Sequence, residues 1–325
     1  MFDLYDAAVY RFALYVGYGS SSHRSKGEAK SGVGAKRTVN TSNRYWIWLL
    51  TALVAFAVCS LFYMNMYAHD PTAPFEGPKL DAPSAEFWLG TDHLGRDVAS
   101  RLIYATYLTL GLAVLAVLLA MTAGTALGML AGYNVAPFLT PLILFIGQIS
   151  IVFPVQLLPL LIITIFGNGT LGMVLSMAFS IWGQFFWLIH DETKALKGRG
   201  FIRAAFMLGS SKWGVVRLHI LPHLLPTVVL LTTICFRMAI GVISTLSFLG
   251  IGISPPTPTW GSMIADGHPF IMQAWWTVVF PTLALACSIL LVNSIGGRLE
   301  RKWKQSDTTH KERRDIHEDN AAAAV

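Results

Sequence analysis

IYATYLTLGLAVLAVLLAMTAGTALGMLAGY, residues 103–133, is a long stretch without Asp, Glu, Lys or Arg. A helix needs about 20 predominantly apolar residues to cross a bilayer, and this stretch is longer than that. The whole chain has the same character, since 54% of its 325 residues are hydrophobic and only 13% are charged. Such a composition is too apolar for an ordinary soluble domain. The sequence therefore predicts an all-α membrane protein.

Five further stretches meet the same length criterion with at most one charged side chain each. They are residues 46–67, 138–166, 171–190, 224–253 and 274–296. We therefore expect six transmembrane helices in one domain, residues 46–297. Residues 1–45 are expected to be a tail, either mobile or with an interfacial helix, and residues 298–325, charged and then Ala-rich, a disordered tail.

The distribution of Lys and Arg predicts the orientation, because these residues are retained on the cytoplasmic side near the ends of spans. They gather in both tails and in residues 191–222, whereas residues 254–273 contain neither. Six spans place both termini on one side, so we expect both in the cytoplasm. The net charge of +6 then reports topology. A nucleic-acid partner is not expected, because that would need a soluble basic domain.

Signatures of catalysis are missing from the sequence. It contains no G-x-S-x-G, H-E-x-x-H or G-x-x-x-x-G-K-[ST] pattern, so hydrolase, zinc protease and ATPase machinery are not expected. No Asp or Glu lies well inside a predicted span, which argues against a carrier driven by protons or sodium. We expect no metal and no cofactor to be bound by this chain. A protein of this kind needs a partner to do work, or it is a passive pore or a scaffold.

A polar segment, FIRAAFMLGSSKWGVVRLHILP, residues 201–222, separates the fourth and fifth predicted spans. The small side chains of Ala204 and Ala205 allow another surface to approach a short helix closely, and Gly209 is suited to end that helix in the left-handed conformation. A second short helix from about residue 212 to 220 is expected to stop at Pro222. These features fit a docking site for another protein and equally a connecting loop with solvated charges.

Glycines share one face of the second predicted span at positions Gly124, Gly128 and Gly132. The G-x-x-x-G-x-x-x-G spacing predicts that another helix backbone packs closely here. A role in sliding or gating is a bolder interpretation that the spacing does not favour over packing.

Charged residues precede the same span. Asp92, Arg96 and Asp97 are spaced for mutual contact, either to fix the start of the helix or to meet an external protein. We expect local ion pairs and an Asp N-cap.

Three segments in order resemble permease subunits of ATP-binding-cassette importers. Ala204, Ala205, Gly209 and residues 219–222 match the signature A-A, three residues, G, nine residues, x-I/V-L-P. Residues 89–105, LGTDHLGRDVASRLIYA, and residues 246–267, LSFLGIGISPPTPTWGSMIADG, narrow the resemblance to the dipeptide, oligopeptide and nickel branch, and to its second permease type. The likeness covers residues 46–300.

This resemblance implies a fold, a site and partners. The fold would be the six-helix type I importer permease, with a cytoplasmic coupling helix between helices 4 and 5. The coupling loop would contain Arg203, Ala204, Ala205, Gly209, Leu221 and Pro222. The partners would be a homologous second permease in a heterodimer, cytoplasmic ATPase subunits that bind ATP and magnesium, and an extracytoplasmic solute-binding protein. The location would be the bacterial inner membrane, in contact with lipid.

Several positions depart from the family pattern. Arg203 stands where the family usually has Glu before Ala-Ala, which suggests either an ATPase with a compensating surface or a position that faces water. Val242 and Ile243 stand where many peptide-transporting relatives carry an acidic residue. The substrate is therefore left open among dipeptides, longer peptides, nickel, metal chelates and antimicrobial peptides.

Arg237 is the one strong charge inside a predicted span. Thr233, Gly241 and Ser244 share its helical face. An unpaired guanidinium is costly in hydrocarbon, so this face should look into the bundle or a water-filled path. One interpretation is a translocation path that favours anionic groups. The other, slightly favoured, is a structural Arg held by backbone carbonyls or by the partner permease.

Overall fold

The computed structural model describes residues 70–154 and 157–298. Apart from one isolated bridge between Thr91 and Asp97, these residues form helices and loops, which confirms the all-α prediction for this part of the chain. Four helices are long and apolar enough to cross a membrane: α3 (Val98–Tyr133), α6 (Thr170–Lys197), the run Lys212–Phe248 that contains α8 and α9, and the last described helix (Trp276–Arg298). The predicted span 46–67 and the tails 1–45 and 299–325 lie outside the described residues.

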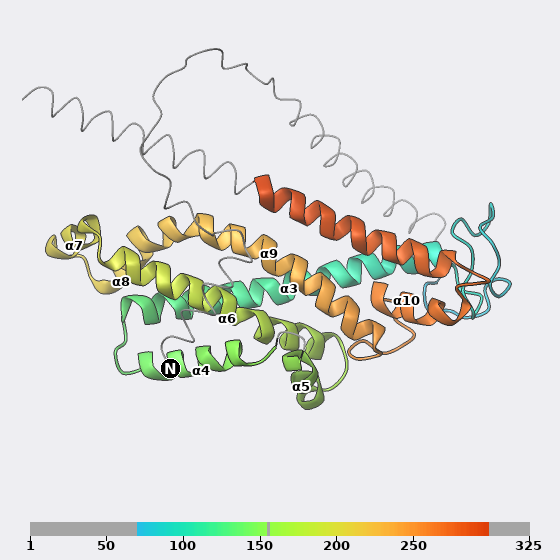
Figure 1. Cartoon of the computed structure of the whole chain (residues 1–325), viewed down its shortest axis with the longest axis horizontal. Helices are drawn as coiled ribbons and strands as arrows, with labels where there is room; N and C mark the ends of the chain where they lie inside the picture. Colours follow the sequence, from blue (N-terminus) through green and yellow to red (C-terminus); the bar gives the residue numbers. More distant parts are fainter. Residues whose placement is uncertain (1–69, 155–156, 299–325) are drawn as a thin grey trace, which may run out of the picture. The chain divides into compact units, whose positions relative to one another are not determined.

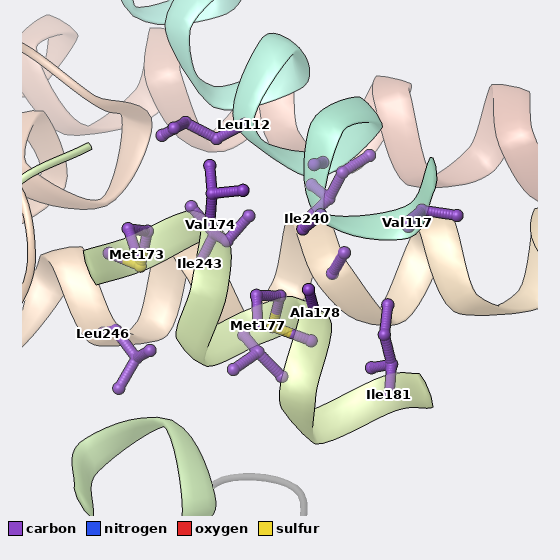
Figure 2. Packing of buried hydrophobic residues seen from close by; sticks show 14 of the residues in the cluster. Leu112, Val117, Met173, Val174, Met177, Ala178, Ile181, Ile240, Ile243 and Leu246 are labelled. Carbon is purple, nitrogen blue, oxygen red and sulfur yellow. The ribbon is translucent and has the colours of Figure 1, made fainter. Parts of the chain in front are cut away.

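The long helices α3, α6 and α9 (Leu221–Phe248) pack along one another (Figure 1). Figure 2 shows side chains of all three helices in this core, among them Leu112 of α3, Met177 and Ile181 of α6 and Ile243 of α9. All four are at most 2% exposed. The helix α6 is the most buried of the apolar helices, because it also contacts α4 (Thr140–Val152) and α5 (Leu157–Phe166).

Glycines allow α3 to approach α6 closely. A Cβ atom at Gly124, Gly128 or Gly132 would lie 2.6 Å from the carbonyl oxygen of Trp182, Phe186 or His190, respectively. These distances are shorter than van der Waals contact, so a larger residue would push the backbones apart. The residue numbers of these facing positions increase in the same direction in α3 and in α6, so the two helices are parallel.

The predicted third span, residues 138–166, is not one helix, so this prediction was wrong. The helix α4 ends at Val152, and Phe153 has an extended backbone with φ −86° and ψ 133°. Pro154 explains the break, because the residue before a proline is driven out of the helical region. With 13 and 10 residues, α4 and α5 are each too short to cross a hydrocarbon core of about 30 Å alone. Because α3 and α6 are parallel, the two together return the chain from the end of α3 to the start of α6.

The helix predicted for residues 212–220 does not stop at Pro222, and this prediction was also wrong. The helix α8 (Lys212–Val215) continues through a π-helical turn, Val216–Ile220, into α9. In this turn the Leu221 N–H donates to the carbonyl oxygen of Val216, five residues back. The wider turn accommodates Pro222, whose ring and missing N–H would conflict with an ordinary helical turn.

Charged residues fix the start of α3. Asp97 is fully buried and accepts hydrogen bonds from the backbone N–H groups of Ala99 (3.2 Å) and Ser100 (3.0 Å). Arg96 Nε lies 2.6 Å from Asp92 Oδ2 in a buried ion pair. The local ion pair and the Asp N-cap expected from the sequence are therefore both present.

The same charges join α3 to α10 (Trp260–Gly267), which follows α9 along the chain. Asp266 Oδ2 lies 3.6 Å from Arg96 Nη2 and 3.5 Å from Arg101 Nη2. Trp260, fully buried, donates from Nε1 to Thr106 Oγ1 at 3.2 Å. The start of α3 and the helix α10 therefore form one packed unit at the end of the bundle opposite α7 (Gly200–Met207) (Figure 1).

Candidate functional site

The segment between α6 and α9 packs on the ends of the long helices. The helix α6 ends at Lys197, Gly198 caps it, and α7 begins at Gly200. Ile202 of α7 is only 2% exposed and belongs to an apolar cluster with residues of α3, α6 and α9. Its buried members are Tyr133, Ile189, Leu196, Ile202, Val215, Val216, Ile220, Leu224 and Val228. Burial of these apolar groups holds α7 against three long helices.

Sequence reasoning missed Ile202 as the residue that anchors α7. The available signal was its spacing of three from Ala205, which places both residues on one side of a helix. Ala205 is partly buried against the apolar cluster. The two adjacent alanines therefore differ in their surroundings, because Ala204 is exposed.

The outer side of α7 is open. Arg203 and Ala204 are exposed, and at the end of the helix Met207 and Leu208 are 86% and 88% exposed. Trp213 of α8 is 61% exposed. Large apolar side chains that are exposed together on a small helix are typical of a surface that another molecule covers.

Gly209 ends the α7 segment with a left-handed backbone, φ +89°. The Ser210 N–H donates to the carbonyl oxygen of Ala205 at 3.2 Å, as in a glycine-terminated helix. Ser211 then caps α8, because its hydroxyl accepts a hydrogen bond from the Gly214 N–H. The tight reversal places α8 beside α7.

The two other residues of the predicted loop signature lie at the start of α9. Leu221 is partly buried and Pro222 is exposed. The next residue, His223, stacks on Phe201 of α7, with ring centroids 5.2 Å apart. The structure therefore brings the signature residues together in one unit made of α7, α8 and the first turn of α9.

This unit is strongly basic. Residues 193–223 contain Lys194, Lys197, Arg199, Arg203, Lys212 and Arg217, and neither Asp nor Glu. In residues 70–154 and 157–298 there is no group of three His, Cys, Asp or Glu side chains that could hold a metal ion.

The four residues predicted to line a path meet different neighbours. Arg237 donates a hydrogen bond to Asn293 Oδ1 on the last described helix. Thr233 faces the same helix, since a Cβ at Gly296 would lie 2.7 Å from its hydroxyl. Ser244 is 5% exposed and its carbonyl oxygen packs on α10, whereas the side of Gly241 is open.

The geometry defines a class of protein, namely an integral membrane protein with several apolar helices and a helical, basic loop packed on their ends. Residues 124–305 match the family described as "Binding-protein-dependent transport system inner membrane component". The chain belongs to this family and is a multi-pass protein of the inner membrane.

Curated relatives agree with this assignment. The chain is 32% identical over 257 residues to the di/tripeptide transport system permease protein DppC of Pseudomonas aeruginosa, covering 77% of this chain and 84% of that one. It is 32% identical over 248 residues to the glutathione transport system permease protein GsiD of Pectobacterium atrosepticum (76% and 81%). It is 29% identical over 259 residues to the nickel transport system permease protein NikC of Escherichia coli (79% and 93%).

Proposed function

We propose that this chain is the second-type permease subunit of an ATP-driven importer for peptides or a related small solute. It forms half of the translocation path in a heterodimer with a homologous permease. Cytoplasmic ATPase subunits bind ATP and magnesium and supply the energy, and an extracytoplasmic binding protein delivers the solute. The chain itself catalyses no reaction and binds no cofactor.

The observation that carries the proposal is the placement of α7. Its inner side is anchored by Ile202 on an apolar cluster shared by α3, α6 and α9, and its outer side exposes Ala204, Met207 and Leu208. A helix so anchored transmits a push on its outer side to three long helices, as a coupling helix must. Gly209 ends the α7 segment, and Leu221 and Pro222 begin α9, so α7, α8 and the first turn of α9 form one compact unit. We place this end, together with both termini, in the cytoplasm because of its Lys and Arg content.

The proposed mechanism uses the continuity of α8 and α9. Closure of the ATPase subunits around ATP pulls on α7 and α8, and the run Lys212–Phe248 carries this displacement across the membrane. The packed unit of α10 and the start of α3 then moves relative to the partner permease, so that the path opens alternately to the two sides. Only 6% of the apolar window of the last described helix is buried, as expected of a helix that faces lipid or the second permease.

The substrate class follows from the relatives, whose names specify di/tripeptides, glutathione and nickel. A peptide or a small peptide-like solute is our first choice, because two of these three relatives carry one. Arg237 favours a carboxylate if its face lines the path, while the bond to Asn293 supports a structural role.

Co-purification of the ATPase subunits tests the proposal. The chain is tagged and co-expressed with its cognate subunits as wild type, as Ala204→Glu and as Ala82→Glu. Ala204 is exposed on α7, and Ala82 is exposed at the opposite end, so the same change is made at both ends. Ala204 is a better site than Ala205, which is partly buried, or Gly209, where a side chain would strain the backbone.

The expected result is loss of the ATPases from Ala204→Glu and their retention by wild type and Ala82→Glu. Retention of the ATPases by the Ala204→Glu variant would mean that their contact with this chain lies outside α7. A non-transporting scaffold or a passive pore is the alternative function. Proteoliposomes containing the complete complex would then take up no solute in response to ATP, and the importer assignment would fail.

A further inference from the structure

A basic cavity of about 630 Å³ lies between α7 and the ends of α3 and α6. Four cationic side chains line it: Lys194 and Lys197 from α6, Arg203 from α7 and Lys212 from α8. No Asp or Glu is among the described residues that line it. The volume lies within the range of about 300–1,000 Å³ that is usual for sites of small ligands.

The acidic groups nearest in sequence are engaged elsewhere. Glu192 Oε1 accepts a hydrogen bond from Thr227 Oγ1 at 3.0 Å, and Asp191 pairs with His190 at 2.9 Å. In the described part of the chain, Lys194, Arg203 and Lys212 take part in no ion pair. Three positive charges therefore face one cavity without a countercharge from these residues.

Lys197 has a separate role in the same cavity. Its ammonium group donates to the carbonyl oxygen of Tyr133 at 3.1 Å and lies over the Tyr133 ring, 5.3 Å from the centroid. It thereby offsets the negative end of α3, which would otherwise repel an anion from this place. Lys194, Arg203 and Lys212 remain to act on an anion in the cavity.

We propose that this cavity binds the phosphate group of an anionic lipid headgroup. It lies at the end of the apolar helix α3 and one to two turns beyond the apolar stretch of α6, within reach of the headgroup layer. Met207 lines the cavity and is 86% exposed, so an apolar rim adjoins the cations as a lipid requires. Free phosphate has the same chemistry and is the other source of the anion. The choice of the cytoplasmic leaflet rests on the proposed function, whereas the anion site does not.

Native mass spectrometry of the full-length chain in detergent tests the site. Phosphatidylglycerol, phosphatidylcholine with the same acyl chains, and inorganic phosphate are the probes. The cavity variant is Lys194→Gln with Arg203→Gln. The control is Arg199→Gln with Arg217→Gln, which removes the same charge from exposed residues of the same loop that do not line the cavity.

We expect wild type to retain phosphatidylglycerol in preference to phosphatidylcholine. The cavity variant should bind it about 25-fold more weakly, at roughly fivefold per cation, and the control variant almost as wild type. Displacement of the lipid by millimolar inorganic phosphate would assign the site to the phosphate group whichever molecule carries it, and would support the proposal. Melting temperatures of both variants confirm that they are folded.

Three results would overturn the proposal: equal weakening in both variants, equal retention of both lipids without an effect of phosphate, or unchanged anion binding by a cavity variant that loses the ATPases. The last result would mean that the cations serve a protein partner. Wild type that retains phosphatidylglycerol but no ATPase would leave the anion site standing and remove the proposed coupling function.

Discussion

The substitution Gly128→Ala, which adds a methyl group between α3 and α6, tests how much the stability depends on the close approach of these helices. The new Cβ would lie 2.6 Å from the carbonyl oxygen of Phe186 and 3.1 Å from the Cβ of Ile189. The first distance falls short of ordinary van der Waals contact, about 3.4 Å, by about 0.8 Å, and a backbone oxygen cannot turn away as a side chain can. Overpacking of this kind costs about 1–3 kcal/mol. We expect Gly128→Ala to lower the free energy of unfolding by that amount relative to Gly111→Ala.

Gly111→Ala is the matched control for this substitution. Both glycines lie in α3, and both changes raise the helix propensity by the same amount, about 1 kcal/mol. No atom lies within 4 Å of a Cβ added at Gly111. The difference between the two variants is therefore the cost of packing alone. Equilibrium unfolding by SDS in mixed micelles, followed by tryptophan fluorescence, measures it, and identical unfolding midpoints would refute the close-packing argument.

Asp266→Asn should destabilise the protein by about 1–2 kcal/mol in the same assay. This is less than the 3–5 kcal/mol typical of breaking a fully buried pair, because 39% of the Asp266 side chain is exposed; the exposed Asp81→Asn is the control and should have no effect. Asp97→Ala should cost about 1–2 kcal/mol through loss of the N-cap, and Asp97→Asn, which also caps, should restore most of it when thermal melting is compared. Arg237→Gln should leave ATPase co-purification intact and reduce ATP-driven uptake if the residue lines the path; failure to assemble would make the bond to Asn293 structural.

The positions of α3, α6 and the last described helix could be predicted because each is a long apolar run, and bilayer length alone identifies such runs. The predicted helix boundaries were wrong at two prolines, Pro154 and Pro222. Membrane helices often tolerate proline, and nothing in the sequence says that Pro154 breaks a helix while Pro222 is carried inside one.

The candidate site was predictable as a segment but not as a surface. Its spacing of Ala204, Ala205 and Gly209 indicated a short helix that ends at a glycine, and α7 has that form. Which alanine faces outward depends on an apolar cluster that includes Tyr133 of α3, which lies far away in the chain. Asp266 was missed for the same reason, because its partners Arg96 and Arg101 are brought to it only by the fold.

The π turn at Val216–Ile220 makes α8, at the end of the basic loop, continuous with the long helix α9. Because the helix does not stop at Pro222, the run Lys212–Phe248 is one continuous helix of 37 residues, about 55 Å along its axis at 1.5 Å per residue. Each degree of tilt imposed at Lys212 swings Phe248 by about 1 Å over that length. A small rotation of the basic loop would thus be magnified at the far end, where α10 is joined to the start of α3. A flexible break in the helix at Pro222 would not transmit this rotation to α9.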